Sequence, residues 1–282
     1  MKNRIINLTI KIVSFSLFIG FSIATAEEVR IMPLGDSITY GNSEADLVDP
    51  RPTSMREAYR SHLYYKLRDV AYDGNFVGSE IAGQGVSPSF DPDNEGHPGW
   101  HSHRFADHTY NFLNNNPADI ILLHIGTNDH IKNAGGVELV LDQIDYFEVQ
   151  NEQPVTVILA LIINREEHDP IVSDFNKDLT RVAKSRIKEG DDIIIVDMEH
   201  DAGLTTGDYA DNTHPNSSGY NKMANIWFDA IISLDGKPAD NKALRDYPYT
   251  IIDKSYINYI YVNSESSYVT FETEIPDSGI AF

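Results

Sequence analysis

Residues 119–126, DIILLHIG, form a short and almost continuously apolar run that ends at a glycine. A run of this length that lacks alternating polar residues predicts a β-strand buried on both faces. Two further runs have the same character, VTVILALII at residues 155–163 and IIIV at 193–196. Strands buried on both faces are typical of parallel sheets, in which helices connect one strand to the next.

Segments with apolar residues at helical spacing alternate with these runs. The helix candidates span residues 55–70, 136–150, 171–188 and 217–233, and shorter strand candidates span 29–34 and 75–78. This alternation predicts an α/β domain over residues 27–234, with a parallel sheet covered by helices on both faces, as in flavodoxin-like three-layer folds. In such folds ligands bind at the carboxyl ends of the strands, which is where Ser37 and Asn128 would lie.

The first 26 residues are typical of a secretory signal peptide. Lys2, Arg4 and Lys11 give a basic start, residues 12–23 are apolar, and residues 24–26 read ATA, a small-residue cleavage motif. We therefore expect a secreted protein, extracellular or periplasmic, without integral membrane contact after cleavage. The alternative is an uncleaved anchor.

The composition changes after residue 234. Residues 235–249 resemble a linker, and SYINYIYV at 255–262 and YVTFETEI at 268–275 flank NSESS, a pattern that predicts a β-hairpin. An isolated hairpin is only marginally stable. We favour a hairpin docked on the main domain over the first part of a carbohydrate-binding or cell-surface β module, and treat residues 235–282 as a linker and a β-rich extension.

Charge and cysteine content exclude several kinds of function. The chain has a net charge of −21, and removal of three positive charges with residues 1–26 would leave −24. A surface this acidic repels nucleic acid and anionic lipid, so we expect no nucleic-acid partner. Because there are no cysteines, the chain has neither a thiolate nucleophile nor a cysteine that could be lipidated.

Four short motifs stand at the ends of the predicted strands or just before helices. They are GDSIT at residues 35–39, EGHPGW at 95–100, IGTND at 125–129 and DNTHP at 211–215. In this order they resemble the SGNH (GDSL-type) hydrolases. The stretches IMPLGDSIT and THPNSSGYNKMANIW most resemble carbohydrate esterase family 3, a group of acetylxylan-esterase-like secreted enzymes.

The resemblance implies a role for five residues. Ser37 would be the nucleophile, His214 its general base, and Asp211 the carboxylate that orients the imidazole. The oxyanion hole would consist of the backbone N–H groups of Ser37 and Gly99 and the side-chain amide of Asn128. The sequence leaves competitors for two of these roles: Asp208 and Asp201 compete with Asp211, and Gly96 competes with Gly99.

Other polar residues in the motifs have simpler interpretations. We expect Asp36 and Asp129 to bind backbone N–H groups of their loops, and Trp100 to belong either to the core or to the wall of an acyl or sugar pocket. The HSH triplet at 101–103 would point to opposite faces of a strand, and no cysteine or spaced acidic residue completes a zinc site. We expect neither a metal nor a cofactor.

The predicted function is that of a secreted serine esterase that removes O-acetyl groups from a xylan-like polysaccharide through an acyl-serine intermediate. Its partner would be the acetylated carbohydrate. One alternative is an esterase or lipase for longer acyl chains, and another is a non-catalytic glycan-binding surface protein. The sequence carries no signal of oligomeric state.

Overall fold

A computed structural model describes residues 28–234, 257–262 and 269–273. The predicted signal peptide, residues 1–26, and the predicted linker, residues 235–249, lie outside the described residues and stay predictions. The chain divides into two compact units, Met1–Pro238 and Ala239–Phe282. Within the described residues no helix is long and apolar enough to cross a membrane.

The first unit is built on a seven-stranded, mostly parallel sheet. Strands β1, β5, β6 and β7 are neighbours in that order, with parallel register throughout. The other edge of β1 pairs with β2 near its start and with β4 near its end, and β3 pairs antiparallel with β4. The strands are β1 (Val29–Gly35), β2 (Gly74–Phe76), β3 (Glu80–Ile81), β4 (Asp93–Gly96), β5 (Ile120–His124), β6 (Thr156–Leu161) and β7 (Ile193–Asp197).

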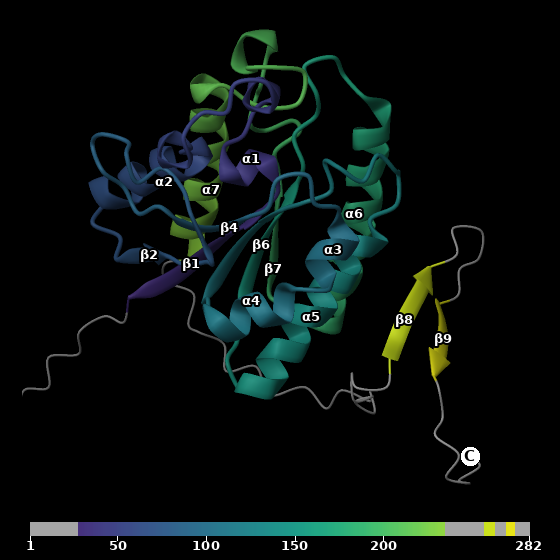
Figure 1. The fold of residues 1–282 in the computed structure, drawn as a ribbon. Coiled ribbons are helices and arrows are strands. Elements are labelled where there is room, and N and C mark those ends of the chain that lie inside the picture. The colour runs from purple at the N-terminus through teal and green to yellow at the C-terminus, as the bar shows by residue number, and fades with distance from the viewer. Residues whose placement is uncertain (1–27, 235–256, 263–268, 274–282) are drawn as a thin grey trace, which may run out of the picture. The chain divides into compact units, whose positions relative to one another are not determined.

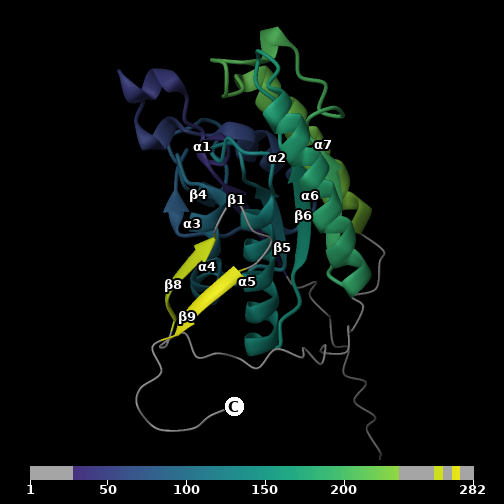
Figure 2. The ribbon, with the colours of Figure 1, turned by 90° about the vertical axis from the view of Figure 1, so that its right-hand side faces the viewer.

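Helices cover both faces of this sheet (Figure 1). One face packs against α2 (Ala58–Asp69) and α7 (Ser217–Leu234). The other packs against α3 (Ser102–Ala106), α4 (Thr109–Asn115), α5 (Gly135–Asn151) and α6 (Pro170–Glu189), the layer that faces the viewer in Figure 2. The predicted α/β fold with helices on both faces is therefore confirmed.

Strand β5 shows why the apolar runs contain no polar alternation. Ile121 and Leu123 contribute to the core beneath α5 and α6, whereas Ile120 and Leu122 contribute to the core beneath α2 and α7. All four are buried. Burial of a large aliphatic side chain stabilises a fold by about 1.5–3 kcal/mol, so these four residues stabilise the packing of helices on both faces of the sheet.

The long helices and central strands begin and end within a few residues of the predicted bounds, but several short elements were not predicted. These are α3, α4, β3, β4, the single turn α1 (Ser37–Tyr40) and the 3₁₀ turns η1 (Glu44–Leu47), η2 (Thr53–Met55) and η3 (Thr206–Asp208). The HSH triplet does not lie in a strand, as the zinc argument assumed, because His101 precedes α3 and Ser102 and His103 begin it.

The second unit contains the predicted hairpin. Strands β8 (Ile257–Val262) and β9 (Val269–Thr273) pair antiparallel, with Val262 opposite Val269. The pairing confirms the hairpin. Docking and the alternative β module both stay predictions.

Candidate active site

Ser37 stands at the point where β1 turns sharply into α1. A Cβ atom at Gly35 would lie 2.2 Å from Thr39 Oγ1 and 2.6 Å from the backbone oxygen of His124, so only glycine fits this turn. The Oδ1 atom of Asp36 accepts a hydrogen bond of 3.0 Å from the Ile38 N–H and caps the helix. This contact is the one expected for Asp36, and it holds the Ser37 side chain at the carboxyl end of β1.

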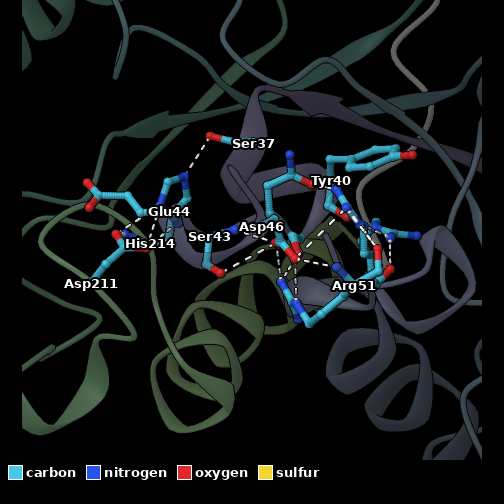
Figure 3. A network of polar contacts seen from close by, with 12 residues as sticks. Ser37, Tyr40, Ser43, Glu44, Asp46, Arg51, Asp211 and His214 are labelled. Atoms are coloured by element: carbon cyan, nitrogen blue, oxygen red, sulfur yellow. Dashed lines mark hydrogen bonds and ion pairs between the residues drawn. The ribbon is translucent and has the colours of Figure 1, made fainter. Parts of the chain in front are cut away.

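Three of the predicted site residues meet in one chain of hydrogen bonds (Figure 3). The Ser37 Oγ lies 2.9 Å from Nε2 of His214. On the other side of the ring, Nδ1 lies 2.9 Å and 3.0 Å from the two carboxylate oxygens of Asp211. Ser37 and His214 are each 8% exposed, so the pair is shielded but reachable from solvent.

The structure shows which of the three candidate aspartates, Asp201, Asp208 or Asp211, contacts His214. Asp208 accepts a hydrogen bond of 2.7 Å from the Lys222 ammonium and further bonds from Thr205, so its carboxylate stabilises the η3 turn and α7. Asp201 is exposed, and its N–H donates to the backbone oxygen of Asp197. Of the three aspartates, Asp211 is the one that contacts His214.

Backbone donors surround the Asp211 carboxylate. It accepts N–H hydrogen bonds from Thr213 at 2.9 Å, from His214 at 2.8 Å and from Glu44 at 2.7 Å. Burial raises the pKa of Asp211, but these hydrogen bonds and the one from the His214 ring outweigh it and leave the pKa below its ordinary value. An ionised carboxylate at Nδ1 fixes the tautomer in which Nε2 can accept the serine proton.

The block 95–100 brings Gly99 to the same edge of the sheet. The His97 N–H donates to the Gly35 backbone oxygen at 2.7 Å, which ties this block to the strand end before Ser37. Gly99 has a φ of +77°, and a Cβ there would meet nothing within 4 Å. Gly96, its competitor, already donates its N–H to Asn94 Oδ1 at 3.0 Å. Gly99 therefore fits a donor role better than Gly96.

Asn128 is anchored beside Gly99. Its Nδ2 donates to the Trp100 backbone oxygen at 3.0 Å, and because an amide carries two N–H bonds, the second stays available to a substrate oxygen. The neighbouring Asp129 accepts hydrogen bonds from the Ser102 N–H at 2.8 Å and the Ser102 hydroxyl at 2.5 Å. This is the loop role expected for Asp129, and it fixes the far end of the Gly99 turn.

Trp100 has no free face for a sugar ring. The imidazole of His97 stacks on it with centroids 4.1 Å apart, and the Arg104 guanidinium lies 4.1 Å from the ring centroid. Two groups this close must occupy opposite faces. Trp100 also packs against the core beneath α5 and α6, so of the two interpretations that the sequence left open, the structure favours packing.

Sequence reasoning missed the residues that hold these loops together. Arg165 donates from Nη1 to Thr213 Oγ1 at 2.5 Å and from Nη2 to the Thr127 backbone oxygen at 3.2 Å, so it links the loops that carry His214 and Asn128. The Glu44 N–H was also missed, although the spacing of Ser43 and Asp46 matches a capping box and could have indicated a helical turn there.

In the described part of the chain no three acidic or histidine side chains gather as a metal site.

The GDSL-like lipase/acylhydrolase family matches this chain over residues 31–227. A multidomain esterase of Ruminococcus flavefaciens is 27% identical in an alignment 237 positions long, which covers 74% of this chain and 29% of that protein. The chain thus spans less than a third of this relative.

Two solved structures of carbohydrate esterases are also similar to this chain. A carbohydrate esterase family 3 protein from Talaromyces cellulolyticus is 26% identical with a TM-score of 0.61, over 73% of this chain and 97% of that one. A family 3 carbohydrate esterase from Clostridium thermocellum is 28% identical with a TM-score of 0.61, over 74% and 99%. The likeness to these esterases argues against the non-catalytic alternative. The chain belongs to the GDSL-like lipase/acylhydrolase family and is a carboxylic ester hydrolase.

Proposed function

We propose that this protein is a secreted serine esterase that removes O-acetyl groups from a xylan-like polysaccharide. The observation that carries the catalytic part is the hydrogen-bonded series of Ser37, His214 and Asp211, with 2.9 Å at each imidazole nitrogen. In this proposal Ser37 is the nucleophile, His214 the general acid and base, and Asp211 the residue that orients and stabilises the imidazolium.

The reaction proceeds in two acyl transfers. Ser37 Oγ attacks the acetyl carbonyl carbon while Nε2 of His214 takes the hydroxyl proton. The tetrahedral intermediate collapses, the bond to the sugar oxygen breaks, and His214 returns the proton to that oxygen. Water, deprotonated by His214, then attacks the acetyl-serine, and acetate leaves as Ser37 regains its proton.

Each intermediate carries a negative oxygen that needs donors already in place. The proposal assigns this role to the N–H groups of Ser37 and Gly99 and to the free N–H of Asn128. It is supported by the contacts that fix the Gly99 turn, namely His97 to Gly35 and Asn128 to Trp100. Donors held in advance stabilise the transition state without reorganisation during the reaction.

The choice of an acetylated carbohydrate rests on the relatives. Both family 3 structures are described as carbohydrate esterases, and a further structure, 26% identical with a TM-score of 0.59, is an acetyl esterase variant with an acetate ion. The net charge of −21 suits an uncharged polymer better than an anionic one. Secretion is proposed from the signal-peptide pattern of residues 1–26.

A hydrolysis panel tests this function. Residues 27–282 are incubated with acetylated xylan, acetylated mannan, acetylated pectin and aryl esters from acetate to octanoate, beside Ser37→Ala. We expect acetate release from xylan and the highest aryl-ester rate with acetate, both absent in Ser37→Ala. Rates that rise with chain length would instead support the longer-chain esterase, and no release from any ester would refute the proposed function.

A further inference from the structure

The loop that follows α1 makes a direct hydrogen bond to the Asp211 carboxylate, which lies in the loop before α7. The Glu44 N–H donates to Asp211 Oδ2 at 2.7 Å, although 167 positions separate the two residues. Asp211 receives its other recorded hydrogen bonds, within the described residues, from Thr213 and His214 of its own loop. Within the described residues, Glu44 is therefore the residue outside this loop that donates a recorded hydrogen bond directly to the Asp211 carboxylate (Figure 3).

An ion pair between the buried carboxylate of Asp46 and the half-exposed guanidinium of Arg51 holds Glu44 in place. Asp46 accepts the Ser43 N–H at 2.8 Å, and it accepts hydrogen bonds from Arg51 through the backbone N–H at 3.0 Å, Nε at 2.9 Å and Nη2 at 2.7 Å. The Asp46 side chain is only 2% exposed. The Asp46 carboxylate thus links Ser43 to Arg51, and Glu44 lies in the segment between these two residues.

The same ion pair is anchored to the helix that carries Ser37. Nη2 of Arg51 donates to the Gly41 backbone oxygen at 2.8 Å, and the Gly41 N–H donates to the Ser37 backbone oxygen at 2.8 Å. A continuous series of contacts therefore runs from the backbone of Ser37 through Arg51 and Asp46 to Glu44 and Asp211.

We propose that the clasp, defined as Asp46 and Arg51, is a positioning device for catalysis: it holds the Glu44 N–H against Asp211 and so aligns the carboxylate with His214. This inference rests on the proposed esterase function. Arg51 keeps the pKa of Asp46 far below its usual range, chiefly through their side-chain hydrogen bonds, so the clasp stays charged over the working range of pH.

A rival explanation must be separated from this one. Leu47 and Val48 of the same loop are 84% and 90% exposed, so damage to the loop could weaken contact with a polymer rather than the alignment of Asp211. A small aryl acetate distinguishes the two, because it brings only the acetyl group and an aryl leaving group to Ser37. A positioning role predicts loss of kcat on the aryl acetate, whereas a role in polymer contact alone predicts loss on xylan only.

The most specific test removes the backbone N–H of Glu44 and controls separately for the loss of its side chain. Glu44 is the first residue of η1, a position that tolerates proline, and Ser43 before it has φ −139° and ψ 169°, the extended conformation that a residue before proline adopts. Glu44→Pro deletes the donor to Asp211, whereas Glu44→Ala deletes only the side chain. We expect kcat on aryl acetate to be about tenfold lower in Glu44→Pro than in Glu44→Ala, the typical effect of one hydrogen bond to a charged group.

A second pair of variants tests the clasp. Asp46→Asn replaces a carboxylate oxygen by a donor that faces Arg51, and Asp49→Asn makes the same change on an exposed residue of the same loop. We expect Asp46→Asn to lower kcat on aryl acetate with little change in KM, and to move the acid limb of the kcat/KM profile to higher pH because Asp211 loses a donor. Asp49→Asn should retain the activity and profile of the wild type.

The results separate this inference from the function on which it rests. If the wild type hydrolyses aryl acetate and Ser37→Ala does not, the esterase function stands. Equal kcat values in Glu44→Pro and Glu44→Ala, both with a wild-type circular dichroism spectrum, would then overturn the positioning role. A loss confined to xylan would overturn it in favour of polymer contact. If Asp46→Asn does not fold, the proline and alanine pair decides alone.

Discussion

The Oγ of Ser37 lies 2.9 Å from Nε2 of His214, although 177 positions separate the two residues along the chain. Ser37 follows the first strand of the sheet, and His214 lies in the loop that precedes the last helix of the domain. The parallel sheet brings them together because the carboxyl ends of β1, β5 and β7 share one edge. The loops that follow β1 and β7 lie together at the top of Figure 1.

Asp211→Asn should lower kcat on aryl acetate by about 10³–10⁴-fold, because an amide can leave the imidazole in the wrong tautomer and does not stabilise the imidazolium. Asp208→Asn is the matched control. It removes the ion pair with Lys222 and should lower the melting temperature while kcat stays near the wild-type value. The assignment of Asp211 fails if Asp208→Asn abolishes turnover and Asp211→Asn does not.

Asn128→Ala should reduce kcat by about 10²–10³-fold, the usual effect of losing one oxyanion donor, with a small change in KM. The variant also loses the bond to the Trp100 backbone oxygen, so thermal unfolding must be measured beside the kinetics. A kcat close to the wild-type value in a folded protein would remove Asn128 from the oxyanion hole.

Arg60→Met should destabilise the protein by about 3–5 kcal/mol, because it leaves several buried backbone oxygens without their donor and each unsatisfied buried acceptor costs about 1–3 kcal/mol. The guanidinium of Arg60 is fully buried and donates to five backbone oxygens, those of Thr39, Tyr40, Arg56, Ala82 and Pro92. Arg68→Met, at the exposed end of α2, is the control. Urea unfolding measures both, and equal midpoints would show that the carbonyl oxygens find other donors.

His124 makes stability depend on pH. Burial lowers the pKa of His124 to about 4. Between pH ~6.5, where the unfolded histidine titrates, and pH ~4 only the unfolded state takes up the proton, so the free energy of unfolding falls as the pH falls, by up to about 3 kcal/mol. His124→Gln, which can still accept the Ile163 N–H, should show a shallower fall in urea unfolding from pH 7 to 4. Parallel curves for the two proteins would contradict this.

Much of the fold could be predicted from the sequence because the central strands are buried on both faces. Their residues must be apolar at every position, and a run such as that of β5 has few other interpretations. Strand β4 could not be found in this way. Its Asn94 and Glu95 are fully buried yet polar, and they are satisfied by contacts with distant residues, among them the Ser79 hydroxyl on Glu95 at 2.7 Å.

In the site, too, some residues could be predicted from the sequence and others could not. Ser37, His214 and Asn128 stand in short motifs that carry a resemblance, and the structure brings Ser37 and His214 into contact and ties Asn128 to the turn that holds Gly99. Glu44 acts through its backbone, so its side chain gives no signal. Arg60 looks like any helix arginine, because its acceptors are backbone oxygens that only the folded chain brings together.

The most direct test of the proposed mechanism is the mass of the protein during turnover. The wild type is mixed with excess aryl acetate, quenched in acid within milliseconds and analysed as intact protein and as peptides. The mechanism predicts a mass increase of one acetyl group on the peptide that contains Ser37, absent from Ser37→Ala. Rapid hydrolysis without any acetylated serine, or full activity in Ser37→Ala, would contradict it.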